Sequence, residues 1–244
     1  MKRAAGVGAG LGVAGAGFAI YNGQVPTAQL YGATICRVPS AGKKMALTYD
    51  DGPNPEQTPR LMALLERFNA HATFFLIGRW AEREPGLIRE LHAAGHAIGN
   101  HTYSHPSMPL LSSGGVREEL ARCREAVEKS GVSFSESDGQ ALMRPPYGRR
   151  RPGTLRTMRA EGYVPVTWSI TCYDWRKPNW WSEKQIAKKA SKAGEGDVIL
   201  LHDGSHLDPA HDRSRSIDAT EETLERFTAD GYEFVTIPEL AASA

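Results

Sequence analysis

Hydrophobic and polar positions follow two different periods along the chain from about residue 43 onward. Short, continuously apolar runs are typical of buried strands. Amphipathic runs with apolar residues three and four apart predict helices. The predicted strands are 45–49, 72–77, 97–99, 141–148 (a strand with its turn), 163–170, 198–201 and 234–235. The predicted helices are 56–68, 87–94, 116–129, 155–161, 182–191 and 217–227.

Strand and helix signals alternate to the end of the chain, which predicts an α/β fold with a parallel sheet and outer helices, either a barrel or a doubly wound sheet. Gly95 stands where a left-handed helix C-cap is needed, and Ser182 is the expected N-cap of its helix. Because no internal repeat or further linker follows residue 42, we expect a single domain over 43–240.

The amino-terminal segment differs from the rest of the chain. Lys2 and Arg3 precede an Ala/Gly-rich apolar run over 4–20, which resembles the charged and apolar regions of an export signal. The run is short for a membrane span. We expect residues 1–28 to be an export signal or an N-terminal anchor and 29–42 to be a linker. A flexible Gly/Ala tail is the alternative.

Composition narrows the class of protein. The chain has 244 residues, of which 41% are hydrophobic and 23% charged, as in an ordinary soluble globular protein. Its 29 basic and 28 acidic side chains give a net charge of +1, which argues against nucleic-acid binding. Cys36, Cys123 and Cys172 are too few for a disulfide framework or a cysteine zinc site. Free thiols are expected, with one disulfide as the alternative if the protein is exported.

Polar clusters follow the predicted strands, where parallel α/β folds place their catalytic groups. Asp50 and Asp51 are adjacent, and like charges this close need a cation or a proton between them. His101 and His105 are four residues apart, so one helical turn would place both imidazoles on one face. Together with one aspartate they predict a divalent metal site. Each motif alone has a plainer explanation, a surface histidine pair or an Asp-Gly-Pro turn.

Five short motifs resemble, in order, those of NodB-like polysaccharide deacetylases, carbohydrate esterase family four. They are "TYDDGP" (48–53), "HTYSH" (101–105), "RPPYG" (144–148), "YDW" (173–175) and "LLH" (200–202). The resemblance covers nearly all of the predicted domain. It implies a distorted (β/α) barrel, the NodB homology domain, and the metal-dependent removal of acetyl groups from sugar polymers.

The resemblance also implies a role for each matching residue. Asp50 would be the general base, paired with Arg144. The ligands of one divalent ion would be Asp51, His101 and His105. Zinc is expected, with cobalt or nickel as alternatives.

The remaining implied roles concern the leaving group and the substrate. His202 would be the general acid, oriented by Asp174. The Tyr147 backbone amide would donate to the oxyanion. Substrate contacts would come from Trp175, which walls the groove, and Leu200, which lines the acetyl pocket. Thr171 stands where the family often has a further aspartate, which puts the local loop geometry in doubt more than the chemistry.

We therefore expect a secreted or envelope-associated monomer that hydrolyses linear amides, namely N-acetyl groups of a GlcNAc polymer such as chitin or peptidoglycan. An O-deacetylase such as an acetylxylan esterase and a non-catalytic glycan-binding domain are the alternatives. No nucleic-acid partner and no membrane span beyond the N-terminal segment are expected. Tyr173, Trp180 and Trp181 are candidates for stacking on sugars, and no residue of the loop 206–216 is assigned.

Overall fold

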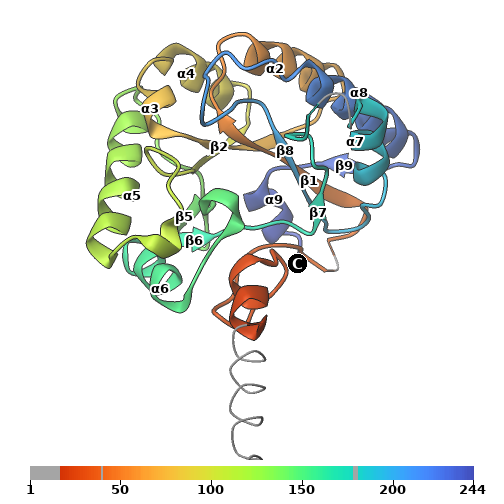
Figure 1. Ribbon diagram of the computed structural model, residues 1–244. Helices are drawn as coiled ribbons and strands as arrows, with labels where there is room; N and C mark the ends of the chain where they lie inside the picture. Colours follow the sequence, from red (N-terminus) through yellow and green to blue (C-terminus); the bar gives the residue numbers. More distant parts are fainter. Residues whose placement is uncertain (1–16, 40, 178–180) are drawn as a thin grey trace, which may run out of the picture.

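The computed structural model describes residues 17–39, 41–177 and 181–244 (Figure 1). Its strands are β1 Lys44–Gly52, β2 Ala72–Leu76, β3 Ala97–Asn100, β4 Glu136–Ser137, β5 Gln140–Met143, β6 Tyr163–Pro165, β7 Ile170–Thr171, β8 Val198–His202 and β9 Glu233–Phe234. Within the described residues they form one nine-stranded sheet of order β4-β5-β3-β2-β1-β8-β7, with β6 paired to β5 and β9 paired to β1. Every ladder is parallel except β4–β5.

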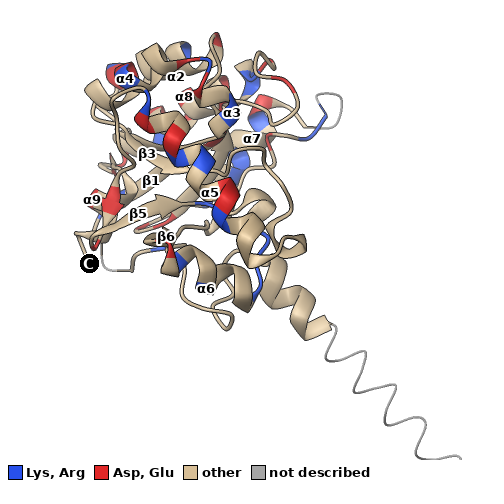
Figure 2. Ribbon diagram, turned by 90° about the vertical axis from the view of Figure 1, so that its left-hand side faces the viewer, with Lys and Arg blue, Asp and Glu red and all other residues tan. Residues whose placement is uncertain are grey.

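Helices lie on the outside of this sheet, with one exception (Figure 1). They are α2 Gln57–Arg67, α3 Gly78–Ala81, α4 Pro85–Ala93, α5 Ser113–Glu128, α6 Pro152–Ala160, α7 Glu183–Ala190, α8 Ser214–Ala229 and α9 Ile237–Ala241, with 3-10 turns η1 Met108–Leu110 and η2 Pro146–Gly148. The exception is α9, which packs Ile237 and Leu240 into the core cluster of the inner face of the sheet (Figure 1). Acidic and basic residues are interspersed along α5, as expected for a helix with a solvated outer face (Figure 2). The predicted α/β architecture is confirmed.

The sheet curves as an open barrel rather than a closed one. Residues 163–170 are predicted as one strand, but the structure divides them between β6, which pairs with β5, and β7, which pairs with β8. Strand β6 ends at Pro165, whose carbonyl oxygen accepts from the backbone N–H of Ile35 at 3.0 Å. No ladder joins β6 to β7 in the described part of the chain. This opening is the distortion of the barrel, and residues 166–169 cross it.

The core fills both faces of the central strands. Leu47 of β1, Phe74 of β2 and Ile199 of β8 are fully buried, and α2 packs Leu61 and Leu65 into the same cluster. The sheet register places the carboxyl ends of β1, β2 and β8 at one edge. Side chains that follow these strands therefore gather at that edge.

All three cysteines lie in described residues, and all are unpaired. Cys123 and Cys172 are buried, and Cys36 is half-buried. The expectation of free thiols is confirmed.

Residues 17–24 form a helix, and the N-terminal segment packs on the domain from Asn22 of this helix onward (Figure 1). Arg150 donates to the carbonyl oxygens of Val25, Pro26 and Ala28 at 2.6, 3.3 and 2.6 Å. The Thr167 hydroxyl donates to Pro26 at 2.8 Å. The predicted export segment 1–28 lies largely outside the described residues. None of the helices in the described ranges is both long and apolar enough to cross a membrane.

Candidate active site

Asp50 and Asp51, at the end of β1, face the same pocket because the strand is irregular there. In a regular strand, consecutive side chains point to opposite faces of the sheet. Asp50 and Gly52 pair with consecutive residues of β2, so Asp51 is an extra residue in a β-bulge. Its φ of 72° lies in the left-handed region that non-glycine residues seldom adopt. We attribute to this bulge the placement of both carboxylates in the lining of one pocket.

His101 and His105 reach this pocket from the loop after β3. The expectation of a helical turn is wrong, because residues 101–107 are not helical. Instead, Thr102 and His105 have positive φ angles of 68° and 63°. The Thr102 hydroxyl accepts the backbone N–H of His105 at 3.1 Å. This turn brings the two imidazole centroids within 5.0 Å, so the histidines converge by another route.

Both imidazoles turn Nε2 toward Asp51. Nδ1 of His101 lies 2.8 Å from the Arg144 carbonyl oxygen, which can only accept, so Nδ1 carries a proton and Nε2 is the nitrogen available to a metal ion. Burial lowers the pKa of His105 to about 3, so this ring is uncharged near neutral pH. The two Nε2 atoms lie 3.6 and 3.3 Å from the same oxygen, Oδ1 of Asp51.

These three side chains form a donor set for one divalent cation. Their ligand atoms lie within 4.8 Å of one another, and Asp51, His101 and His105 are all buried. Burial raises the pKa of Asp51, but the contact with His206 and the neighbouring histidines outweigh it and leave that pKa below its ordinary value. Oδ1 of this buried carboxylate has no hydrogen-bond donor among the described residues. An ionised, unpartnered oxygen beside the Nε2 atoms of two imidazoles fits a divalent metal ion.

Arg144, which follows β5, is fully buried and pairs with Asp50. Its Nη1 donates to Asp50 Oδ1 and to Thr48 Oγ1, both at 2.8 Å. Its Nη2 donates to the Thr167 carbonyl at 3.0 Å. Burial lowers the pKa of Arg144, although the Asp50 charge opposes this, and an arginine stays protonated in such surroundings. The pair leaves Oδ2 of Asp50 at 3.7 Å from Nε2 of His101, beside the candidate metal ligands.

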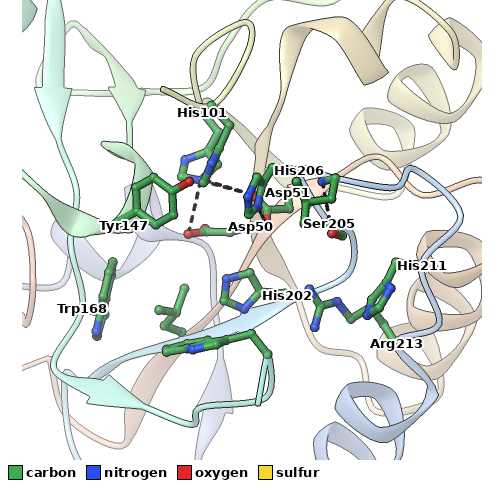
Figure 3. Close-up of a pocket in the computed structure, with 14 residues that line it drawn as sticks. Asp50, Asp51, His101, Tyr147, Trp168, His202, Ser205, His206, His211 and Arg213 are labelled. Atoms are coloured by element: carbon green, nitrogen blue, oxygen red, sulfur yellow. Dashed lines mark hydrogen bonds and ion pairs between the residues drawn. The ribbon is translucent and has the colours of Figure 1, made fainter. Parts of the chain in front are cut away.

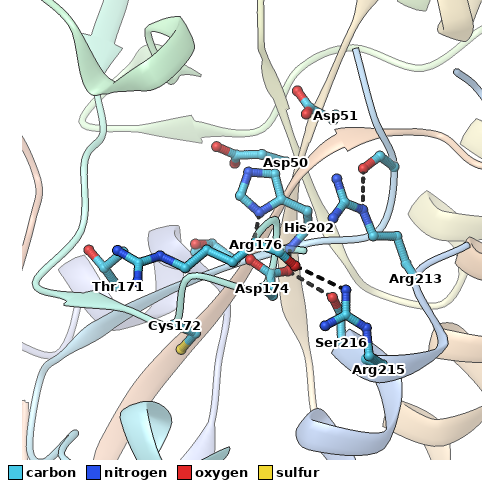
Figure 4. A network of polar contacts seen from close by, with 12 residues as sticks. Asp50, Asp51, Thr171, Cys172, Asp174, Arg176, His202, Arg213, Arg215 and Ser216 are labelled. Atoms are coloured by element: carbon cyan, nitrogen blue, oxygen red, sulfur yellow. Dashed lines mark hydrogen bonds and ion pairs between the residues drawn. The ribbon is translucent and has the colours of Figure 1, made fainter. Parts of the chain in front are cut away.

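His202 ends β8 and lines the pocket together with Asp50 (Figure 3). Asp174 is buried and accepts from Nδ1 of His202 at 2.9 Å and from its backbone N–H at 2.7 Å (Figure 4). The Ser216 hydroxyl also donates to Asp174, at 2.8 Å. Burial lowers the pKa of His202, but the Asp174 carboxylate outweighs it and leaves the pKa raised. Burial likewise raises the pKa of Asp174, but His202 leaves it lowered.

The pocket has a volume of about 440 Å³, and the three predicted substrate contacts all line it. Leu200 is buried, whereas Trp175 and Tyr147 are 45% and 47% exposed. Tyr147 has a φ of 59°, and its ring meets His105 edge-on at 4.6 Å between centroids. Trp175 meets His202 edge-on at 5.2 Å. The pocket therefore combines polar groups with apolar walls, as small ligand sites do.

Sequence reasoning missed a second group of lining residues. It comprises Ser205, His206, Leu207, His211 and Arg213, all from the loop between β8 and α8, together with Trp168. The only signal in the sequence is a histidine-rich loop directly after the fifth motif. Such a pattern does not reveal which side chains turn inward.

Aromatic residues near the fourth motif pack in a row that ends at Trp175, which lines the pocket. Tyr173 lies 5.5 Å from Trp175 and 5.8 Å from Trp181, measured between ring centroids. Trp180 lies outside the described residues. The hydroxyl of Thr171, the departure from the family pattern, accepts the indole N–H of Trp168 at 2.7 Å. It therefore ties a pocket wall to β7.

Comparisons with known proteins agree on one family. The family model for polysaccharide deacetylases matches residues 37–166. A peptidoglycan-N-acetylglucosamine deacetylase of Bacillus cereus is 36% identical over 86% of this chain and 93% of its own. A chitooligosaccharide deacetylase of Azorhizobium caulinodans is 34% identical over 71% of this chain and 80% of its own. A crystal structure of a peptidoglycan N-acetylglucosamine deacetylase is 30% identical, with a TM-score of 0.71 over 84% of this chain and 91% of its own.

Proposed function

The chain belongs to the polysaccharide deacetylase family, and from this premise we propose that it is a metal-dependent hydrolase of N-acetyl groups on a GlcNAc-containing envelope polymer. The observation that carries the proposal is a pocket with two acid–base groups, each hydrogen-bonded to a buried charged partner. Asp50 is paired with Arg144, and His202 is paired with Asp174. The cation-binding side chains Asp51, His101 and His105 line the same pocket.

Hydrolysis of an acetamide needs a stronger nucleophile than water and a protonated amine leaving group. Asp51, His101 and His105 would hold a divalent ion, which would supply Lewis acidity toward the acetyl carbonyl and toward water. Asp50 accepts the proton from the attacking water. The Arg144 guanidinium is the counter-ion of Asp50 and fixes its orientation.

His202 completes the reaction as the general acid. The departing amine is strongly basic, so it needs a proton as the C–N bond breaks. Asp174 stabilises the imidazolium and orients the ring through Nδ1, leaving Nε2 free to donate. The Tyr147 backbone N–H stabilises the developing oxyanion. Leu200 contacts the acetyl methyl group, and Trp175 covers the sugar ring and excludes water.

We extend the proposal to the metal, the location and the assembly state. Two imidazoles and one carboxylate are a typical ligand set of catalytic zinc, so zinc is the proposed ion. A polymer of the envelope requires an enzyme outside the cytoplasm, which suits an export or anchor segment within 1–28. The catalytic domain is 43–240, and it acts as a monomer on a long polymer.

Acetate release from chitin oligomers, peptidoglycan and acetylated xylan tests the proposal. The purified protein is expected to release acetate from one or both N-acetylated substrates, and a chelator is expected to abolish the release. Release from acetylated xylan alone would indicate an O-deacetylase instead. Binding of these glycans without acetate release under any divalent metal would indicate a non-catalytic domain and overturn the proposal.

A further inference from the structure

His206 has no role in the reaction described above, yet it lies against the candidate metal ligands Asp51 (Figure 3) and His105. Its ring stacks on the ring of His105, with centroids 4.3 Å apart and planes 19° apart. Its Nδ1 lies 3.7 Å from Oδ2 of Asp51. The side chain is 30% exposed, so it forms a wall of the pocket rather than part of the core.

The two oxygens of Asp51 face different partners. Oδ1 lies beside Nε2 of His101 and His105, at 3.6 and 3.3 Å. Oδ2 faces His206. A carboxylate that binds a metal through one oxygen can rotate unless its second oxygen is also held. Polar groups that hold metal ligands in this way typically contribute tenfold to 100-fold to metal affinity.

The backbone of the His206 loop is anchored at three successive carbonyls. The Gly204 carbonyl accepts from Nε of Arg213 at 2.7 Å, and the Ser205 carbonyl accepts from the indole of Trp80 at 3.1 Å. The His206 carbonyl accepts from Arg79. The fold therefore determines the position of His206, although its ring is partly exposed.

The same loop packs directly on the strand that carries Asp51. A Cβ at Gly204 would lie 2.2 Å from the Asp51 carbonyl oxygen, so only glycine fits there. Two residues farther along, His206 is brought over the Asp51 side chain. The contact between His206 and Asp51 is thus determined by close backbone packing and not by the side-chain conformation of His206 alone.

We propose that His206 is a positioning residue that orients Asp51 and covers the face of His105, and thereby raises the affinity of the site for a divalent ion. It acts through these residues and not as a ligand. In the described chain the mutually close donor atoms belong to Asp51, His101 and His105, without His206. The distance of 3.7 Å exceeds that of a hydrogen bond, so the contact is an electrostatic one between the ring and the Asp51 carboxylate.

The inference rests on the metal site of the proposed function and is tested by metal affinity. The metal-free protein is titrated with Zn²⁺ and with Co²⁺ against a competing chromophoric chelator. His206→Ala is expected to weaken binding by about tenfold or more. His206→Asn places an amide nitrogen near the position of Nδ1 and should retain more of the affinity. His211→Ala, a pocket-lining change in the same loop, serves as the matched control and should leave affinity unchanged.

Further measurements separate positioning from loss of structure. Excess metal is expected to restore the kcat of His206→Ala to near the wild-type value, and the visible spectrum of its Co²⁺ form should differ from that of the wild type. Equal affinities for His206→Ala and the wild type would overturn the role of His206 alone. A wild-type protein that binds neither ion would overturn the proposed function and this inference together.

Discussion

Replacing Asp174 by asparagine tests the role of His202 as the general acid. Asp174 is buried and accepts from Nδ1 of His202 at 2.9 Å, from its backbone N–H at 2.7 Å and from Ser216 at 2.8 Å. Asparagine has the same shape and keeps one acceptor oxygen. It lacks the charge, however, and turns either an amide group or a neutral oxygen toward the imidazole. The variant therefore removes the counter-ion of His202 with little change in packing.

The size of the effect follows from the charge pair. Two unit charges about 4 Å apart attract by ~4 kcal/mol at an effective dielectric constant of ~20. Since each 1.36 kcal/mol is a factor of ten in rate, losing all of this at the transition state would lower kcat by ~10³-fold. Structural relaxation reduces the loss, so we expect a fall of about 10² to 10³-fold on an amide substrate.

The pH dependence has a definite sign. In the wild type the pKa of His202 is raised, so the ring keeps its proton to higher pH. Without the carboxylate the ring loses its proton earlier, and the alkaline limb of the kcat profile should move to lower pH. The raised pKa of His202 also stabilises the folded protein. This stabilisation is fully present at a pH below the ordinary pKa of histidine, and it is lost as the pH rises through the raised pKa of the folded state. The lowered Asp174 pKa adds stability that is lost as the pH falls through it.

The assay is acetate release from an N-acetylated chitin oligomer and from acetylated xylan, each across the pH range. Amide hydrolysis should fall far more than any ester hydrolysis, because an alkoxide leaves with less need of a proton. Ser216→Ala removes one hydrogen bond to Asp174 and keeps the charge of that carboxylate, so it should raise the activation free energy by only ~1 kcal/mol. An Asp174→Asn protein with amide activity within about threefold of wild type and an unmoved alkaline limb would refute the reasoning.

Three further predictions concern the other side of the pocket. Asp50→Asn should lower kcat by about 10² to 10⁴-fold. Its affinity for Zn²⁺ in a chelator-competition titration should stay near wild type, and a large loss of metal would contradict the assignment of Asp50 as base. Arg144→Ala leaves the buried Asp50 without its partner, so the free energy of unfolding measured in urea should fall by about 3–5 kcal/mol. Arg149 is exposed, so Arg149→Ala should leave the free energy of unfolding nearly unchanged. Exhaustive chelation should abolish acetate release and lower the Tm, because an ion at 100 times its Kd adds ~2.7 kcal/mol to the free energy of unfolding. Full activity after chelation would contradict a metal site.

The strongly periodic elements could be predicted from the sequence. The helix expected at 56–68 is α2, because its apolar stripe fits the 3.6-residue period. Gly95 has the expected left-handed conformation, with φ at 80°. The strand expected at 163–170 was too long, because an apolar run does not show where the chain leaves one strand pair for another. Short elements such as α3 carry too few residues to show any period.

The candidate site could be predicted in its membership but not in its geometry. The motifs correctly predicted that Asp51, His101 and His105 lie close together. Neither the bulge at Asp51 nor the turn at His105 could be predicted, because both depend on positive φ at non-glycine residues. These conformations are unfavourable locally and persist only where tertiary contacts support them. His206 was missed for a related reason, since its position depends on contacts with Arg79 and Trp80 from a distant segment.

The N-terminal segment has a consequence for maturation. Residues 25–28 accept hydrogen bonds from Arg150 and Thr167, and the Thr167 carbonyl accepts from Arg144. A protease that trimmed the chain beyond residue 28 would leave the guanidinium of Arg150 without these acceptors. It would also remove a hydrogen-bond acceptor of Thr167, the residue whose carbonyl oxygen holds the buried Arg144. Cleavage sites compatible with a working enzyme are therefore expected upstream of these few residues, so proteolytic processing and catalytic competence depend on the same short stretch of backbone.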